Sequence, residues 1–218
     1  MKMKIYKKCI VIFLLILIFG LIPLGAQGLG LEVFIEPGVN YSHWKWFGIL
    51  PVKLTPQIAV WVENEEGEII QTLLVSRRGG EGSWRGADEG RPEALPVFTH
   101  KNKSTELDSV TSATPKGNKV FCAASGESLS EGRYIVFAEV NSSFDYNNTY
   151  PETEGDVNGQ PSLIYYAEVA LDQDAGEIDL VPLGTGAVQG DSGEVFPGVE
   201  GLTSALSILS SIRVQQNL

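Results

Sequence analysis

The chain has 218 residues, 43% of them hydrophobic, and a formal net charge of −11 at pH 7. Binding to a nucleic acid backbone requires clustered Lys and Arg, so this acidic composition excludes nucleic acid as a partner and opposes binding to anionic lipid head groups. Of the two cysteines, Cys9 falls in an expected leader, which leaves Cys122 without a partner for a disulfide. Cys122 lies in an expected strand, where a lone cysteine is typically a small buried hydrophobe.

Residues 1–28 have the order of a secretory signal peptide: early lysines, an apolar run over residues 10–24, and small residues after it. Gly20 and Pro23 interrupt the run, which is also shorter than the roughly 20 residues of a membrane-spanning helix. We therefore expect cleavage near Gly28 and no stable membrane span afterwards. The alternative is an uncleaved single-span anchor.

The remainder, residues 29–218, is expected to lie in the periplasm as a single domain, since about 190 residues can bury one sizeable core. Loss of the four leader lysines changes its net charge from −11 to −15. Apolar and polar residues alternate with a period of two in most regular segments, which indicates half-buried strands. The expected strands cover residues 31–36, 58–63, 69–75, 119–124, 134–140, 163–171 and 177–183.

Residues 58–75 give the clearest local structure, because the turn-forming sequence Asn64-Glu-Glu-Gly67 separates two β-rich runs. Near the end of the chain, leucines recur at helical spacing and predict one short amphipathic C-terminal helix over residues 202–210, with a strand after it at residues 212–214 as a further option. Short strands joined by turns, without alternating helices, favour an all-β, antiparallel, immunoglobulin-like β-sandwich with long loops.

Catalytic and metal-binding motifs are incomplete in this sequence. Gly190-Asp-Ser-Gly193 resembles the nucleophile loop of chymotrypsin-type proteases, but neither His43 nor His100 lies in the sequence context of that family's histidine. The segment is therefore interpreted as a turn, and no catalytic residue is expected. The two histidines lack metal ligands at suitable spacing, and the acidic loop 142–157 lacks the register of a calcium loop, which favours a solvated loop and no metal site.

One loop has a more informative sequence, Asp108-Ser-Val-Thr-Ser-Ala-Thr114-Pro. It resembles the Asp-x-x-Ser/Thr-Gly-Ala-Thr motif at which exported flavoproteins receive covalent FMN from a periplasmic FMN transferase. The resemblance implies that Thr114 accepts the FMN phosphate as an ester, within a segment formed by Asp108, Thr111, Ser112 and Ala113. Small neighbours suit a hydroxyl that must enter a transferase site. Ser112 replaces the usual glycine, and the alternative is a Ser/Thr turn before the proline.

Several segments together also resemble a family of periplasmic proteins of unknown function, whose members are thought to be encoded near FMN-transferase and membrane redox genes. The resemblance implies export and a β-rich fold, and it suggests a redox context. The segments that carry it are Ile58–Glu63, Ala94–Lys101, the loop Asp108–Pro115, Gly132–Asn141 and Gly159–Glu168.

The leading hypothesis is a non-catalytic periplasmic protein that binds a small ligand or another protein through its loops, within an extracytosolic redox system. The alternative is an electron carrier with FMN on the acceptor threonine. Function is expected in residues 77–118, which are too long for a simple connection, and in residues 142–157. The second loop combines acids with Phe144, Tyr146 and Tyr150, which are suited to covering a ligand.

Overall fold

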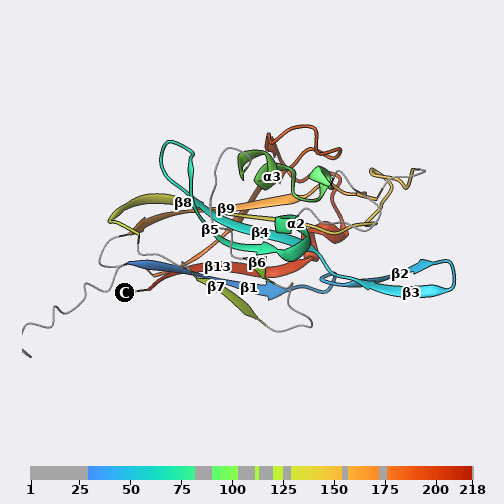
Figure 1. Cartoon of the computed structure of the whole chain (residues 1–218), viewed down its shortest axis with the longest axis horizontal. Helices are drawn as coiled ribbons and strands as arrows, with labels where there is room; N and C mark the ends of the chain where they lie inside the picture. Colours follow the sequence, from blue (N-terminus) through green and yellow to red (C-terminus); the bar gives the residue numbers. More distant parts are fainter. Residues whose placement is uncertain are drawn as a thin grey trace, which may run out of the picture.

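The computed structural model describes residues 29–81, 90–102, 111–112, 120–124, 129–153, 157–171 and 176–217, so the expected signal peptide lies outside the described residues. The described chain forms two packed sheets, a separate two-stranded hairpin and short helical segments (Figure 1). None of the helices in the described ranges has the length and apolarity of a membrane span.

The larger sheet contains β4 (Gln57–Glu63), β5 (Ile69–Ser76), β6 (Thr111–Ser112), β8 (Gly132–Asn141), β9 (Leu163–Leu171), β11 (Val181–Thr185) and β12 (Phe196–Pro197). The smaller sheet contains β1 (Gly30–Pro37), β7 (Phe121–Ala124), β10 (Glu177–Asp179) and β13 (Leu209–Asn217). The hairpin comprises β2 (His43–Phe47) and β3 (Leu50–Leu54). The helical segments are α2 (Arg77–Glu81), η1 (Pro92–Ala94), α3 (Pro96–Asn102) and η2 (Ser204–Ser207).

The two sheets form the layers of a β-sandwich. The strand order is β12-β11-β9-β8-β4-β5-β6 in the larger sheet and β10-β13-β1-β7 in the smaller one. All strand pairs are antiparallel apart from β5 with β6. The expected all-β, antiparallel sandwich is therefore confirmed, as are the predicted hairpin at residues 58–75 and the strands at 134–140 and 163–171.

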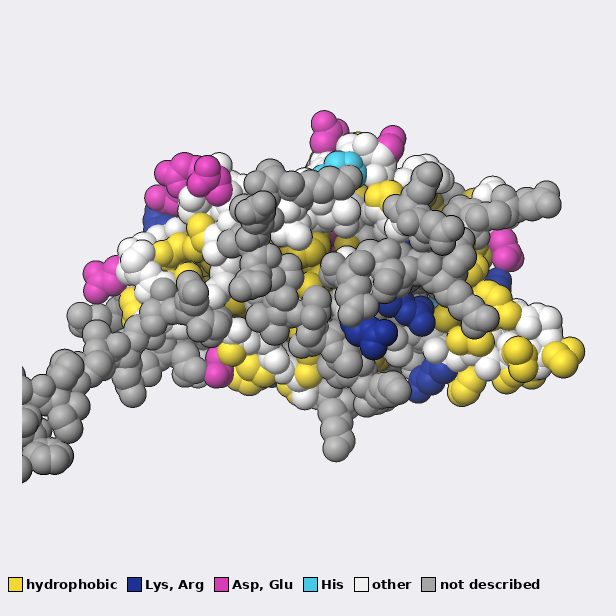
Figure 2. Space-filling view, in the orientation of Figure 1, with side chains coloured by type: hydrophobic (Ala, Val, Ile, Leu, Met, Phe, Trp, Pro, Cys, Tyr) yellow, Lys and Arg dark blue, Asp and Glu magenta, His cyan; other side chains and the backbone are white. Residues whose placement is uncertain are grey.

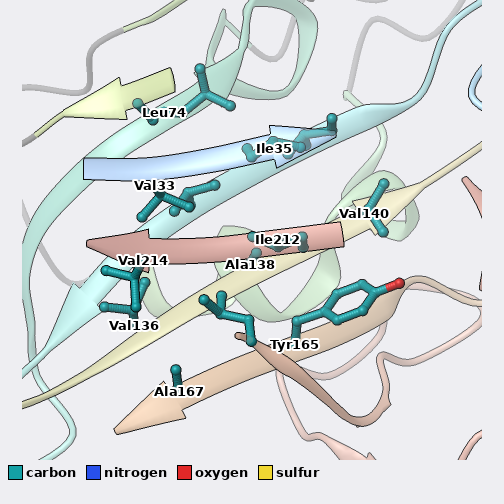
Figure 3. Packing of buried hydrophobic residues seen from close by; sticks show 14 of the residues in the cluster. Val33, Ile35, Leu74, Val136, Ala138, Val140, Tyr165, Ala167, Ile212 and Val214 are labelled. Carbon is teal, nitrogen blue, oxygen red and sulfur yellow. The ribbon is translucent and has the colours of Figure 1, made fainter. Parts of the chain in front are cut away.

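The main core lies between the sheets and follows the period-two pattern of the sequence. Val33 on β1 and Ile212 on β13 face Val136, Ala138 and Val140 on β8, and all five are buried (Figure 3). Because successive side chains of a strand point to opposite faces, each of these strands contributes every second residue to this layer. Burial of this continuous apolar layer is the main source of stability for the sandwich.

The predicted strand at residues 177–183 is divided between the two sheets. β10 pairs with β13 in the smaller sheet, whereas β11 pairs with β9 in the larger one. Between them, buried Leu180 donates its backbone N–H to the carbonyl of Ile212 at 2.9 Å. This segment therefore closes one side of the sandwich by passing from one layer to the other.

The C-terminal segment differs from its prediction. The expected helix over residues 202–210 is reduced to the single 3-10 turn η2, and β13 begins at Leu209. β13 lies between β1 and β10, where Ile212, Val214 and Gln216 are buried at a spacing of two. Pairing on both edges satisfies the backbone of this β-branched segment, which outweighs the helical spacing of its leucines.

Cys122 also differs from its prediction. The expected strand is present as β7, but Ala123 points into the core and Cys122 is exposed on the opposite face. Desolvation and the nearby Glu32 carboxylate raise the pKa of the Cys122 thiol. Since a reactive cysteine requires a lowered pKa, this thiol is not activated as a nucleophile.

The outer face of the larger sheet is covered by α3, a helix that the sequence reading left inside a long irregular segment (Figure 1). Val97 and Phe98 of α3 form a second buried cluster with Trp61 and Ile164 from the sheet. β4 is consequently buried on both faces over its whole length, rather than on one face only.

Candidate functional site

β2 and β3 form an apolar arm, residues 43–54, that projects from the end of the sandwich (Figure 1). Phe47 pairs with Leu50, which leaves Gly48 and Ile49 as a two-residue turn. Gly48 has a φ of 64°, and a glycine at the first of two central positions is the signature of the type II′ turn that joins tightly twisted strands. The turn therefore fixes the register of the hairpin and sets Ile49 at its tip.

The arm exposes large apolar side chains on both of its faces. Trp44 and Trp46 lie on one face, and each is 64% exposed. Phe47 and Leu50 lie on the other, and the tip residue Ile49 is 89% exposed. A single exposed leucine is normal on a protein surface, but a contiguous apolar group of this kind marks an interaction site.

One face of the arm, as far as the residue before the turn, packs against the loop that follows β8. Phe47 packs edge-on against Phe144, with ring centroids 5.4 Å apart. The Lys45 ammonium lies 5.2 Å from the ring centroid of Phe144 and 5.5 Å from that of Tyr146, and it forms a 3.0 Å ion pair with Glu152. These contacts hold the arm in a defined direction, while Ile49, Leu50 and the face that bears the two tryptophans stay exposed.

The loop at residues 142–157 was expected to cover a ligand, and the structure gives its aromatic residues another role. Phe144 and Tyr146 surround Lys45 of the same chain, and Tyr150 packs against the main core. Phe144 adopts a φ of 60°, unusual for a residue with a bulky side chain, which directs the backbone through the tight turn at residues 143–144. The loop is therefore a support for the arm in the described structure.

The acidic groups of this loop do not converge on a common point. Asp145 accepts a hydrogen bond from Ser204, and the Asn147 side-chain oxygen accepts from the backbone N–H groups of Thr149 and Tyr150. No group of three or more potential metal ligands occurs within the described ranges. Glu154 and Asp156, which the calcium hypothesis also considered, lie outside those ranges.

A second polar site lies beneath α3, where the fully buried Glu139 carboxylate accepts three hydrogen bonds. The donors are the backbone N–H groups of Val97 at 3.2 Å and Phe98 at 2.8 Å, together with the Ser162 hydroxyl at 2.6 Å. Burial raises the pKa of Glu139 to about 7, although the three donors oppose the shift. Since the free N–H groups of a helix start need acceptors, Glu139 fixes the first turn of α3 on the sheet.

The last turn of α3 is held by a second carboxylate, Glu63 of β4. Its Oε1 accepts hydrogen bonds from Trp61 Nε1 at 2.6 Å and from Lys101 Nζ at 2.5 Å. Glu63 is buried and Lys101 is partly exposed. Both carboxylates beneath α3 are thus occupied by groups of this chain, which assigns them to structure rather than to chemistry on a substrate.

The two histidines do not form a catalytic arrangement within the described residues. His43 Nδ1 lies 3.5 Å from the Ser142 hydroxyl, but its Nε2 is buried and has no hydrogen-bond partner in the described part of the chain. His100 donates from Nδ1 to the Pro96 carbonyl at 2.9 Å. Gly193 packs against the His100 side chain, so the Gly-Asp-Ser-Gly segment contacts α3 as a packed turn. A triad would require a carboxylate on a histidine that faces a serine.

The residues of the flavin motif fall mostly outside the described structure. Asp108, Ala113 and Thr114 are in the segments that it does not describe. Thr111 and Ser112 form β6, whose backbone pairs with Val75 and Ser76 at the outer edge of the larger sheet. The sequence reading missed the arm, although the aromatic-rich run His43–Phe47 and the apolar run Leu50–Leu54, separated by Gly48-Ile49, are a hairpin signal.

Comparisons with known proteins add no relationship to these observations. No family model matches the chain, and neither a curated protein nor a solved structure shows significant similarity to it. The description of the site therefore depends on its own geometry, in which the arm gathers half of the large exposed hydrophobic residues of the described ranges.

Proposed function

We propose that this protein is an exported, non-catalytic docking protein of the periplasm, which attaches to another surface through the apolar arm. One observation carries the proposal. Twelve large hydrophobic residues are exposed in the described part of the chain, and six of them lie within the twelve residues of the arm. Exposure of so much apolar surface in one hairpin is unfavourable in water, and it is retained where a partner covers it.

The rigidity of the arm supports the same function. Lys45 and Phe47 anchor one face of the arm on Phe144, Tyr146 and Glu152. A surface that is ordered before binding loses less conformational entropy when it binds, so these contacts raise affinity without touching the partner. The buried residues Glu139 and Glu63 hold α3 on the larger sheet, so the sandwich is a fixed support for the arm.

The test is site-specific photo-crosslinking in the native host. A photoreactive amino acid replaces Ile49 at the tip of the arm, and in a matched control it replaces Val39, which is 87% exposed but lies outside the arm. We expect covalent adducts, seen in the mass of the chain, from position 49 and not from position 39. Equal adduct formation at both positions, or none at position 49, would exclude the arm as the docking surface.

A second candidate function is electron transfer by FMN attached to Thr114. The motif in residues 108–114 supports it, and β6 brings the preceding residues, Thr111 and Ser112, to the edge of the larger sheet. Bound flavin would supply the redox chemistry. Co-expression with an FMN transferase should then add the mass of one FMN phosphoester, and Thr114→Ala should abolish the addition. An unmodified mass in the wild type would reject this function.

A further inference from the structure

We propose that the surface bound by the apolar arm is the outer part of an anionic phospholipid bilayer, into which the tip of the arm inserts. The inference rests on the proposed function and names the partner of the same surface. The arm enters only the head-group and upper acyl region, because its strands of five residues extend about 17 Å, roughly half of the 30 Å hydrocarbon core.

The distribution of exposed side chains around the arm favours a bilayer over a groove. Trp44 and Trp46 are exposed on one face, Leu50 and Val52 on the other, and Ile49 at the tip. A protein partner that bound one face by strand addition or in a groove would leave the opposite face in water. A fluid bilayer surrounds an inserted tip and covers both faces at once.

The order of residue types along the arm matches the layers of a membrane interface. Ile49 and Leu50 occupy the tip, Trp46 lies behind them opposite Pro51, and Trp44 lies further from the tip, opposite Lys53. Aliphatic side chains partition into the acyl region, tryptophan into the interface, and lysine to the phosphate level. The tip therefore carries aliphatic side chains and the levels behind it carry tryptophan, while the long Lys53 side chain can extend from the level of Trp44 to the phosphates.

The charges of the arm complement anionic lipids although the protein as a whole is acidic. No Asp or Glu occurs from residue 37 to residue 62, and the arm exposes Lys53, whereas Lys45 is ion-paired with Glu152 at 3.0 Å. On the face shown in Figure 2, Lys and Arg side chains gather mainly in the half that bears the arm, and acidic side chains lie in both halves. Glu152 lies at Lys45, and acidic groups that are further from the tip than the Debye length of about 10 Å are largely screened from the membrane there.

The experiment is vesicle co-sedimentation of the chain exported and purified from its host, with the same N-terminus in every variant as verified by mass. The vesicles contain either phosphatidylcholine alone or phosphatidylcholine with one third phosphatidylglycerol. Ile49→Asp places a charge at the tip, where the side chain makes little contact with the fold. Val39→Asp makes the same change in charge at an equally exposed aliphatic residue outside the arm.

We expect the wild type and Val39→Asp to bind the anionic vesicles with equal affinity and the neutral vesicles several-fold more weakly. Ile49→Asp should lose at least tenfold in affinity, because a carboxylate at the tip must be transferred out of water. Equal binding of Ile49→Asp and the wild type would overturn the proposal, as would absence of binding to either vesicle.

Two further results separate failure of this inference from failure of the proposed function. Adducts from position 49 that consist of another protein, in a chain that does not bind vesicles, would preserve the docking function and reject the lipid. Sedimentation velocity tests a second copy of the chain as the occupant. A dimer that Ile49→Asp converts to a monomer would also reject the lipid in favour of self-association.

Discussion

The outer layer under α3 and the apolar arm differ in which side chains they bury: the first buries carboxyl groups, and the second exposes large apolar side chains. Under α3, the carboxyl groups of Glu139 and Glu63 are buried, and each accepts hydrogen bonds from donors of the same chain. In the arm, Trp44, Trp46 and Ile49 are exposed to water. The first arrangement stabilises the fold, and the second contributes little to it. The contrast agrees with the proposed binding role of the arm.

Tryptophan gives the largest expected difference between the two regions. Trp61 is fully buried in contact with Phe98 and Phe137, so we expect Trp61→Ala to lower the free energy of unfolding by about 3–5 kcal/mol. Urea denaturation followed by circular dichroism measures the change. A loss below about 1 kcal/mol would show that the layer under α3 does not stabilise the fold.

Removal of the buried carboxylate is expected to have the next largest effect. Glu139→Ala leaves the N–H groups of Val97 and Phe98 and the Ser162 hydroxyl without their acceptor, at a cost of about 3 kcal/mol in the free energy of unfolding. Glu168 is a matched control, because it lies on the adjacent strand β9 and is exposed. Glu168→Ala should change the same quantity by less than about 0.5 kcal/mol. Equal effects of the two variants would contradict the role assigned to Glu139.

The same carboxylate predicts a dependence of stability on pH. The unfolded chain releases the Glu139 proton near the ordinary pKa of 4.5, whereas burial raises the pKa to about 7 in the folded protein. The folded state therefore binds more protons than the unfolded state between these two pH values. The stability that Glu139 contributes in this way is fully present below about pH 4.5 and is lost as the pH rises to about 7. The free energy of unfolding should fall by about 3 kcal/mol over this range, because each unit of difference between the folded and unfolded pKa corresponds to about 1.4 kcal/mol.

The relevant measurement is the difference in pH dependence between the wild type and Glu139→Gln, because other carboxylates titrate in the same range. Urea midpoints from pH 4 to pH 8 should decline more steeply for the wild type, since the glutamine cannot ionise. Parallel curves for the two proteins would show that Glu139 does not titrate with a raised pKa.

The smallest expected effect concerns the tryptophans of the arm. Trp44→Ala and Trp46→Ala should each change the free energy of unfolding by less than about 0.5 kcal/mol, because both side chains are largely exposed. Circular dichroism and urea denaturation measure this change under the conditions used for Trp61→Ala. A loss above about 2 kcal/mol would assign the arm to the fold and remove the contrast with the outer layer.

The sequence predicted the strands of the sandwich where a single face is buried, as in residues 134–140 and 163–171, because period-two alternation arises from one-sided burial. It did not predict α3, whose first turn depends on Glu139, about forty positions later in the chain. A helix of seven residues has little intrinsic stability, so this contact with the sheet determines it.

The arm was missed for a different reason. Apolar residues occupy both of its faces, so no alternation with polar residues distinguishes it, and Pro51 argues against a strand. The contact between Lys45 and the aromatic residues Phe144 and Tyr146 joins segments about a hundred residues apart. Local patterns contain no information on such a contact, and the aromatic loop was therefore assigned to a ligand.

Depth-dependent fluorescence quenching tests the central claim, that the arm inserts into a bilayer, most directly. Vesicles with bromine atoms at defined positions along the acyl chains quench only tryptophans that reach those depths. We expect bromines near the head groups to quench the wild type most strongly. When Trp84 is replaced by Phe in both proteins, the double variant Trp44→Phe/Trp46→Phe should lose this quenching, since the one tryptophan that it retains, Trp61, is buried within the sandwich. Quenching that is absent in the wild type, or equal in the two proteins, would contradict insertion of the arm.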